Sequence, residues 1–392
     1  MTPAARKELP EGWRWVRLAE VIREAQGGFA SGERDPKGVV QLRMNNVTNR
    51  GGFDWGSVVR VPADRETIET YRLLEEDVVF NNTNSTELVG KTALFEAYCE
   101  PVLFSNHFTR LRTIPELLTP PFLAFWLQER WQRRVFADIC NRWIGQSAVQ
   151  RDKLLALDMP LPPLAEQKRI AGVLSEQVGA VERPRAATEA QLEAAKALPA
   201  AYLRQSLAGS RNLMALSDCL IEVSRGIGST WSQYRVLGAT RAGLALAKER
   251  VGKHPERYKL VDAGTIFYNP MRILLGSIAM VDEGDETGIT SPDYVVLKTK
   301  QGVLHPRWFY YWLRSPEGDC FVKTLTRGAV RERMLFRRLA EASIELPPWS
   351  AQTEAAAKLT PVRTAAETMA QQLAAINALP AALLRRAFSG EL

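Results

Sequence analysis

Two kinds of hydrophobic pattern alternate along the chain. In residues 1–160 and 208–345, short apolar runs separated by polar turns predict strands, and each region also contains stretches with helical spacing. In residues 161–207 and 346–392, apolar residues recur at helical spacing through most of the segment. The pattern therefore predicts a mixed α/β region, a long helix, a second mixed region and a second long helix.

The two helical segments carry a narrow apolar seam. Steps of three and four residues, as in a coiled coil, separate Leu359, Val362, Ala366, Met369, Leu373 and Ile376. The first segment has the same spacing at Ile170, Leu174, Val178 and Val181, and resumes it after Pro184 at Thr188, Leu192 and Ala195. Since a single seam cannot bury its own apolar edge, we expect the two helices to pair within the chain. Pro184 and Pro361 are expected to kink or divide them.

The two halves of the chain are repeats of one another. The first helix opens LPPLAEQKRIAGVL and the second LPPWSAQTEAAAKL, so that Gln167 corresponds to Gln352, 185 residues later. In the mixed regions, EEDVVFNNTNSTELVGKTALF aligns with DAGTIFYNPMRILLGSIAMV. This alignment pairs Phe80 with Phe267, Gly90 with Gly276 and Trp126 with Trp312. The frameworks match while the loops differ, which is typical of one scaffold carrying two specificities.

Charge and cysteine content narrow the class of protein. The formal net charge is +7, with the basic excess mainly in residues 208–345, and permits a polyanionic partner without requiring one. Cys99, Cys140, Cys219 and Cys320 show no metal or redox spacing, and free thiols suit a reducing compartment. Neither a signal peptide nor an apolar run long enough for a membrane span is evident. We therefore expect a soluble, cytoplasmic protein with no metal site.

Catalytic motifs are not convincing. The segment STELVGKT, residues 85–92, approaches a phosphate-binding loop but lacks its first glycine and precedes an apparent strand instead of a helix. Asn269-Pro270-Met271-Arg272 approaches a methyltransferase motif without its aromatic residue, and a turn explains it more simply. Neither a nuclease-like set of carboxylates with a lysine nor a Ser/His/Asp set is evident. The sequence thus predicts no catalytic residue.

Three segments carry a family resemblance. LPPLAEQKRIAGVL, the terminal LLRRAFSGEL and the opening LPEGWRWVRLAEV resemble the specificity subunit of Type I restriction-modification systems. That family alternates two target recognition domains with two long helices that pair antiparallel. The resemblance implies recognition domains at 1–160 and 208–345, of α/β (α+β) class, and spacer helices at 161–207 and 346–392 that form an intramolecular coiled coil. The second helix departs from the pattern at Trp349 and Ala351.

The resemblance also implies a function and partners. The chain would read a two-part, asymmetric site on double-stranded DNA, with helix length setting the unread gap. It would not be an enzyme. Two methyltransferase subunits would modify adenine with S-adenosylmethionine, and restriction subunits would translocate on and cleave DNA with ATP and Mg. This chain would bind none of these cofactors.

Side chains that match base edges are the candidates for DNA contact. Arg, Lys, Asn and Gln present donors and acceptors in suitable pairs, and Arg and Lys also neutralise phosphates. Each candidate residue also has an ordinary reading as a solvated loop or helix position. The candidates in loops or at helix ends are Arg43, Asn45, Asn46, Asn82, Thr83, Asn84, Ser85, Lys91, Arg142, Gln146, Asn269, Arg272, Lys323, Arg327, Arg331 and Arg333.

An interaction protein without DNA remains the alternative. A coiled-coil-organised scaffold of a related defence system, with recognition regions that bind protein, has the same hydrophobic pattern. The two functions differ in salt dependence, because binding through phosphates weakens steeply as salt rises.

Overall fold

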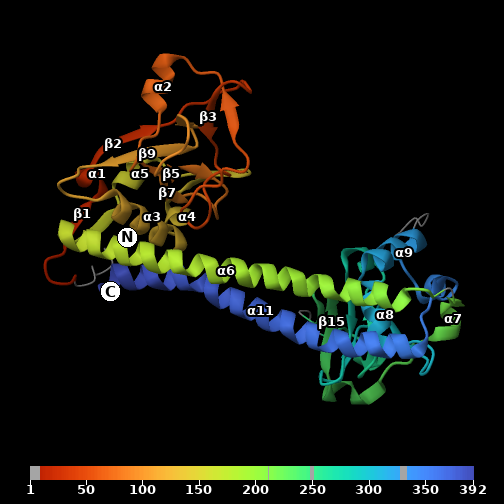
Figure 1. Ribbon diagram of the computed structural model, residues 1–392. Helices are drawn as coiled ribbons and strands as arrows, with labels where there is room; N and C mark the ends of the chain where they lie inside the picture. The colour runs from red at the N-terminus through yellow and green to blue at the C-terminus, as the bar shows by residue number, and fades with distance from the viewer. Residues whose placement is uncertain (1–8, 211, 248–250, 327–332) are drawn as a thin grey trace. The chain divides into compact units, whose positions relative to one another are not determined.

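The chain forms two compact units in a computed structural model that describes residues 9–210, 212–247, 251–326 and 333–392 (Figure 1). The first unit combines the chain up to Ala186 with Ala374–Leu392, and the second comprises Ala187–Leu373. Each unit therefore contains one mixed α/β region and parts of both long helices.

The first unit is built around a four-stranded antiparallel sheet in the order β2-β9-β5-β7. A second sheet, β4-β3-β8, contains the parallel pair β3·β8, and β1 pairs with β12 beside the start of the long helix. The strands are β1 (Arg14–Arg17), β2 (Ile22–Gly27), β3 (Val39–Leu42), β4 (Val59–Val61), β5 (Val78–Asn81), β6 (Thr83–Asn84), β7 (Thr92–Leu94), β8 (Val102–Phe104), β9 (Phe108–Thr113), β10 (Asn141–Trp143), β11 (Gln146–Ala148) and β12 (Asp158–Leu161). The short helices are α1 (Leu18–Val21), α2 (Arg65–Tyr71), α3 (Pro120–Gln132), α4 (Val135–Ile139) and α5 (Arg151–Leu155).

The second unit repeats this plan. Its central sheet has the corresponding order β14-β21-β18-β19, and its parallel pair is β15·β20. The strands are β13 (Leu213–Ala215), β14 (Leu220–Glu222), β15 (Arg235–Thr240), β16 (Gly243–Leu246), β17 (Lys259–Val261), β18 (Ile266–Tyr268), β19 (Ile278–Met280), β20 (Gly288–Thr290), β21 (Val295–Thr299) and β22 (Ser343–Glu345). The helices are α7 (Leu216–Cys219), α8 (Pro306–Leu313), α9 (Pro316–Thr326) and α10 (Phe336–Ala340), with 3₁₀ turns η1 (Gly228–Gln233), η2 (Pro255–Arg257) and η3 (Ile273–Leu275).

Each central sheet has apolar side chains on both faces, because alternate residues of a strand point to opposite sides. In β5, Phe80 packs in the core that contains α3, while Val79 packs in the smaller core towards β3 and β8. In β18, Tyr268 lies in the core that contains α8, and Phe267 lies in the smaller core. Phe80 therefore corresponds to Tyr268, and the predicted pairing with Phe267 is wrong by one residue.

The backbone hydrogen bonds confirm the shifted alignment. The amide of Asn81 donates to the carbonyl of Lys91, and that of Asn269 donates to the carbonyl of Ser277. Gly90 lies ten positions after Phe80, whereas Gly276 lies eight positions after Tyr268. The second loop is thus two residues shorter, and the predicted pairing of Phe80 with Phe267, one residue before Tyr268, exchanges the two faces of the strand.

The two long segments are each one helix, α6 (Leu164–Leu207) and α11 (Trp349–Ser389). Both run through their internal prolines, so the expectation that Pro184 or Pro361 divides a helix is wrong. In the first unit Leu384 lies in the same core as Ile170 and Leu174, and the guanidinium of Arg169 donates to the carbonyl of Leu392.

The helices also meet in the second unit, where the ammonium of Lys358 lies 5.7 Å from the ring centroid of Tyr202. The end of one helix therefore meets the start of the other in each unit. This arrangement confirms the predicted antiparallel pairing.

The segment PPFLAFWLQERWQRRVF, residues 120–136, begins with one helix and ends in a second. α3 ends at Gln132, and Arg134 adopts a left-handed conformation with φ of 63° before α4 begins at Val135. Phe122 and Trp126 of α3 are buried, and Val135 belongs to the next helix. Because a non-glycine residue with positive φ cannot continue a right-handed helix, the chain turns at this point.

The spacing that the two LPP…Q segments share has a structural explanation. The side-chain amide of Gln167 donates to the carbonyls of Leu117 and Pro162, at 2.8 and 2.9 Å, and its oxygen accepts from the amide of Thr119 at 2.9 Å. The amide of Gln352 donates to Val303 and Pro347, at 3.0 and 2.9 Å, and its oxygen accepts from His305 at 2.8 Å. Both glutamines are fully buried. Each one ties the start of a long helix to the residues that precede α3 or α8, and we call these contacts the glutamine clamps.

Candidate nucleic-acid interface

A small sheet in the first unit brings together two of the predicted groups of DNA-contacting residues. Strand β11 pairs with β10 on one side and with β6 on the other, so that Ser147 lies opposite Asn84 and Ala148 opposite Thr83. The hydroxyls of Thr86 and Ser147 lie 2.7 Å apart. The segments 82–86 and 141–150 therefore form one surface, although they are far apart in the sequence.

The third predicted group is joined to this surface through Lys91. Its side chain is only 5% exposed, and its ammonium donates to the carbonyls of Met44 and Val47, at 3.2 and 2.5 Å. Burial lowers the pKa of Lys91. The preceding Gly90 has φ of 94°, and a Cβ atom there would lie 2.2 Å from the ring of Phe136. Lys91 thus holds the loop at residues 43–47 against the loop at 82–91.

Two predicted asparagines also direct their polar groups inward. The side-chain oxygen of Asn46 accepts from the amide of Arg43, and its nitrogen donates to the carbonyls of Asp54 and Ser57. The side chain of Asn84 bonds to Asn81 and to the amide of Ser85. Both asparagines are buried. These side chains shape the loops, and their main polar groups already have partners within the protein.

The remaining candidates of the first unit reach the surface to different extents. Asn45, Arg142 and Gln146 are exposed, while Arg43, Asn82, Thr83 and Ser85 are half-buried. Arg142 donates to the carbonyl of Ala137, which fixes its position beside the small sheet. Burial lowers the pKa of His107, and the positive charge of the nearby Arg43 lowers it further.

The hairpin β10–β11 exposes two apolar residues that the sequence analysis did not select. Trp143 is 60% exposed, and Ile144 is fully exposed. Trp143 pairs with Gln146, so Ile144 and Gly145 form the turn, and Gly145 has φ of 77°. The signal in the sequence was an apolar pair immediately before a glycine in an otherwise polar segment, NRWIGQS. We call Trp143 and Ile144 the hairpin tip.

The second unit presents a different surface at the corresponding position. Asn269 is half-buried and caps the amide of Met271, while Met271 and Arg272 are exposed. The amide of Met334 donates to the carbonyl of Pro270, as that of Val149 donates to Asn82 in the first unit. Arg333, the residue before Met334, is therefore held close to the loop that contains Arg272.

The other basic candidates of the second unit differ in what can be described. Lys323 is exposed but donates to the carboxylate of Asp319, 2.5 Å away, one turn earlier on α9. Arg327 and Arg331 lie outside the described residues. Three large apolar side chains, Met271, Leu275 and Leu335, are exposed near the described candidates.

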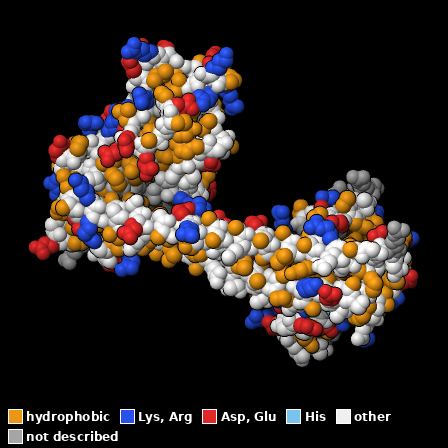
Figure 2. Space-filling model, in the orientation of Figure 1, with side chains coloured by type: hydrophobic (Ala, Val, Ile, Leu, Met, Phe, Trp, Pro, Cys, Tyr) orange, Lys and Arg blue, Asp and Glu red, His pale blue; other side chains and the backbone are white. Residues whose placement is uncertain are grey.

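The charges do not gather into one patch on the visible face of either unit. Figure 2 shows Lys and Arg side chains interspersed with Asp and Glu on this face. Within the ranges that the structure describes, no cluster of His, Cys, Asp and Glu could hold a metal ion, and no helix is long and apolar enough to cross a membrane.

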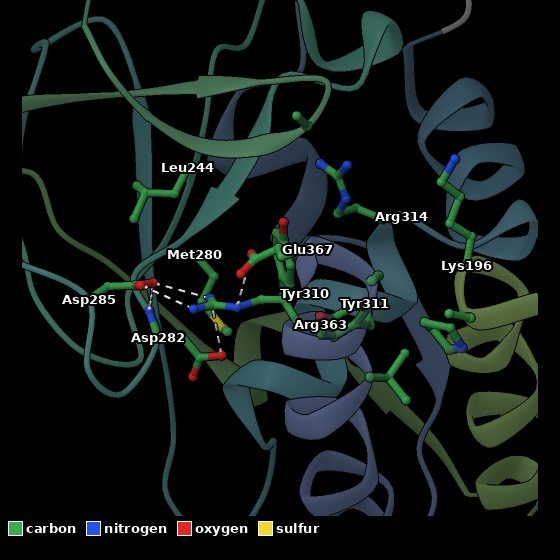
Figure 3. A pocket seen from close by; sticks show the side chains of 15 residues that line it. Lys196, Leu244, Met280, Asp282, Asp285, Tyr310, Tyr311, Arg314, Arg363 and Glu367 are labelled. Carbon is green, nitrogen blue, oxygen red and sulfur yellow. Dashed lines mark hydrogen bonds and ion pairs between the residues drawn. The ribbon is translucent and has the colours of Figure 1, made fainter. Parts of the chain in front are cut away.

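A cavity of about 410 Å³ in the second unit is lined by both long helices and the α/β region. Figure 3 shows Arg363 pointing from α11 towards Asp282, Asp285 and Glu367. Asp282 also forms a buried ion pair with Arg307. Because these charges face one another, their simplest role is to attach α11 to the recognition region.

Comparisons with known proteins agree with this architecture. The model of the Type I restriction modification DNA specificity domain matches residues 10–192. A putative type I restriction enzyme MjaX specificity subunit from Methanocaldococcus jannaschii is 31% identical over 171 residues, which are 43% of this chain and 40% of that protein. The type I restriction enzyme EcoKI specificity subunit from Escherichia coli strain K12 is 22% identical over 440 residues, covering 98% of this chain and 90% of that protein.

Solved structures share the fold over nearly the whole chain. The type I restriction-modification S subunit from M. genitalium has a TM-score of 0.58 at 13% identity and covers 97% of this chain and 98% of that one. A chain from a structure of the complex assembly and conformational transition of a type I R-M system has a TM-score of 0.62 at 19% identity. The match covers 98% of this chain and 100% of that one.

The repeated units and paired helices share the fold of solved Type I restriction-modification subunits. Residues 10–192 match the specificity-domain model, and the chain is similar to specificity subunits of these systems over nearly its whole length. The chain spans less than half the length of two curated relatives. It covers 40% of the MjaX subunit and 29% of the type I restriction enzyme EcoAI specificity subunit from Escherichia coli.

Proposed function

We propose that this chain is the DNA-sequence-specificity subunit of a Type I restriction-modification system. The observation that carries the proposal is the pairing of equal scaffolds with unequal loops. Both units have the same order of strands in the central sheet and the same glutamine clamp. The loops after β5 and β18 nevertheless differ in length and chemistry. Two different readers on one repeated scaffold suit a two-part, asymmetric DNA target.

The exposed candidates are the residues that we propose to contact DNA. Asn45, Arg142 and Gln146 in the first unit, and Arg272 and Arg333 in the second, present free donor or acceptor atoms of the kind that base edges and phosphates accept. Asn46, Asn84 and Lys91 hold the first-unit loops in shape, so we propose that they act on recognition indirectly. The half-buried candidates Arg43, Asn82, Thr83, Ser85 and Asn269 can turn one edge towards DNA.

The reaction itself belongs to partner subunits in this proposal. The chain selects the site, methyltransferase subunits modify adenine with S-adenosylmethionine, and restriction subunits use ATP and Mg to translocate on and cleave DNA. We propose that this chain binds none of these cofactors. The match to the specificity-domain model and the assembly named for the solved structure of TM-score 0.62 support the proposed association with other subunits.

Mapping of methylated adenine tests the proposed function. The chain is expressed with the modification subunit of its own genome, and N6-methyladenine is mapped across the host genome by single-molecule sequencing. We expect a split motif with a fixed gap, and no such motif when either protein is expressed alone. A complex that forms without methylating any motif would contradict the proposal.

A salt titration separates this function from the protein-binding scaffold. If the units neutralise phosphates, the logarithm of the DNA association constant falls linearly with the logarithm of the salt concentration. Binding to a protein partner through mainly apolar and hydrogen-bonding contacts changes much less. Absence of salt-dependent DNA binding would favour the scaffold.

A further inference from the structure

The hairpin tip is an unusual surface for a protein in water. Trp143 and Ile144 are adjacent, and the structure exposes most of both side chains. A contiguous exposed apolar surface of this kind commonly marks an interaction site. Its position at the end of a hairpin means that it can enter a groove that a flat surface cannot.

Hydrogen bonds to neighbouring segments fix the base of the hairpin. Strand β11 pairs with β6, and the amide of Val149 donates to the carbonyl of Asn82 at 2.9 Å. On the other strand, Arg142 donates to Ala137, and the ammonium of Lys153 donates to the carbonyl of Ile139 and to the side chain of Asn141. The base of the hairpin is therefore bonded on both sides, while Trp143 and Ile144 at its tip are exposed.

The chemistry around the tip favours duplex DNA as the partner. Exposed Arg142 and Gln146 flank the apolar pair directly, and both are side chains that bond to base edges. The tip is continuous with the polar loop at residues 82–86 through the paired strands β6 and β11. An apolar pair enclosed by such donors resembles the apolar wedges that proteins insert between base steps.

We propose that Trp143 and Ile144 insert at a base step beside the part of the target that the first unit reads, and unstack it. This inference rests on the proposed function. Aromatic side chains stack on bases of any sequence, so the tip would add affinity and deform the duplex without reading a particular base. An enzyme that modifies a base within a duplex must remove that base from the stack, and a wedge nearby lowers the cost of this step.

Permanganate footprinting tests the inference, because permanganate oxidises unstacked thymines. The probes are duplexes that the full wild-type chain, with its modification subunit, retains from a random-sequence pool. The test variant is Trp143→Ala/Ile144→Ala. Leu74→Ala is the matched control, because Leu74 is also a large exposed apolar residue of the first unit but lies outside the hairpin. Trp143→Phe keeps an aromatic ring at the tip.

We expect the double variant to bind the selected duplexes about tenfold more weakly or worse. At saturating protein it should also lose the permanganate-reactive thymine that wild type produces beside one half of the target. Leu74→Ala should match wild type in both measurements, and Trp143→Phe should retain most of the reactivity. Because both tip residues are exposed, the substitutions should leave thermal unfolding unchanged.

Three results would overturn the inference while the proposed function stands. The first is wild-type affinity and reactivity in the double variant, and the second is weaker binding with an unchanged permanganate pattern. The third is loss of the modification subunit from the double variant with DNA affinity intact, which would assign the tip to a protein interface. If wild type retains no duplex at all, the proposed function fails and this inference fails with it.

Discussion

The recognition surfaces of the two units differ much more than the scaffolds beneath them. In the first unit, Lys91 reaches two backbone carbonyls of the loop at residues 43–47. In the second unit the equivalent residue is Ser277, whose hydroxyl donates to the carbonyl of Ala239 at 2.8 Å. The same point in the fold is therefore bridged by a long charged side chain in one unit and by a short neutral one in the other.

This difference shows how a repeated scaffold can carry two surfaces. The main-chain bonds that connect the loops to the sheet recur, as in Val149 to Asn82 and Met334 to Pro270. The side chains presented by those loops change, from an asparagine-rich segment to one containing Met271, Arg272 and the exposed Leu275. Much of this variation lies at exposed loop positions, where it costs little stability because side chains at the surface contribute little to the core.

Loss of the glutamine clamps should have the largest effect, and an equal one in the two units. Gln167→Ala or Gln352→Ala leaves two carbonyls and one amide without their buried partner, so we expect each to lower the free energy of unfolding by about 3 kcal/mol. Urea unfolding measures the loss, and hydrogen exchange locates it in one unit or the other.

Gln146→Ala serves as the control for both, since Gln146 is exposed. Its effect should stay within about 0.5 kcal/mol. A large loss from one clamp variant and none from the other would contradict the equivalence of the two scaffolds.

Loss of the loop bridges should be smaller and unequal. Lys91→Ala removes a buried ammonium that bonds two carbonyls, and should cost about 2 kcal/mol. Ser277→Ala removes a single neutral hydrogen bond and should cost about 1 kcal/mol. Equal losses in urea unfolding would show that the charged bridge has no special role in the first unit.

Acid should weaken both units modestly through one histidine in each. Burial and the charge of Arg43 lower the pKa of His107, and burial and Arg307 lower that of His305. The unfolded chain therefore binds these protons more readily than the folded one, and stability falls as pH drops below the ordinary histidine pKa of about 6.5.

The histidine effect can be measured by thermal unfolding at several pH values. His107→Gln and His305→Gln should each reduce the slope of stability against pH between about pH 7 and 5. A slope that is unchanged in both variants would assign the acid sensitivity to other groups.

The scaffold was largely predictable from the sequence, and the recognition surface was not. Apolar periodicity and the repeated LPP…Q segments predicted the long helices, their pairing and the tandem α/β regions. The alignment of β5 with β18 was wrong by one residue because the loop lengths differ and the two phenylalanines were matched to each other. Phe80 and Phe267 look equivalent in sequence, yet they occupy opposite faces of their sheets.

Side-chain direction was the main limit at the candidate interface. Asn46, Asn84 and Lys91 are polar residues in loops, which the sequence alone assigns to solvent, but their polar groups satisfy buried backbone groups. Conversely, Trp143 and Ile144 are apolar and were not selected as candidates, although the turn at Gly145 places them in solvent. Only the paired strands β6, β10 and β11 show which of these residues share a surface.

The central claim is that each unit reads its own half of one target. Methylation mapping with two variants tests it most directly: Arg142→Ala/Gln146→Ala in the first unit and Met271→Ala/Arg272→Ala in the second. All four side chains are exposed, so folding should be unaffected. The account predicts that each variant weakens or relaxes one half of the split motif and leaves the other half unchanged. Loss or relaxation of both halves by either variant would contradict it.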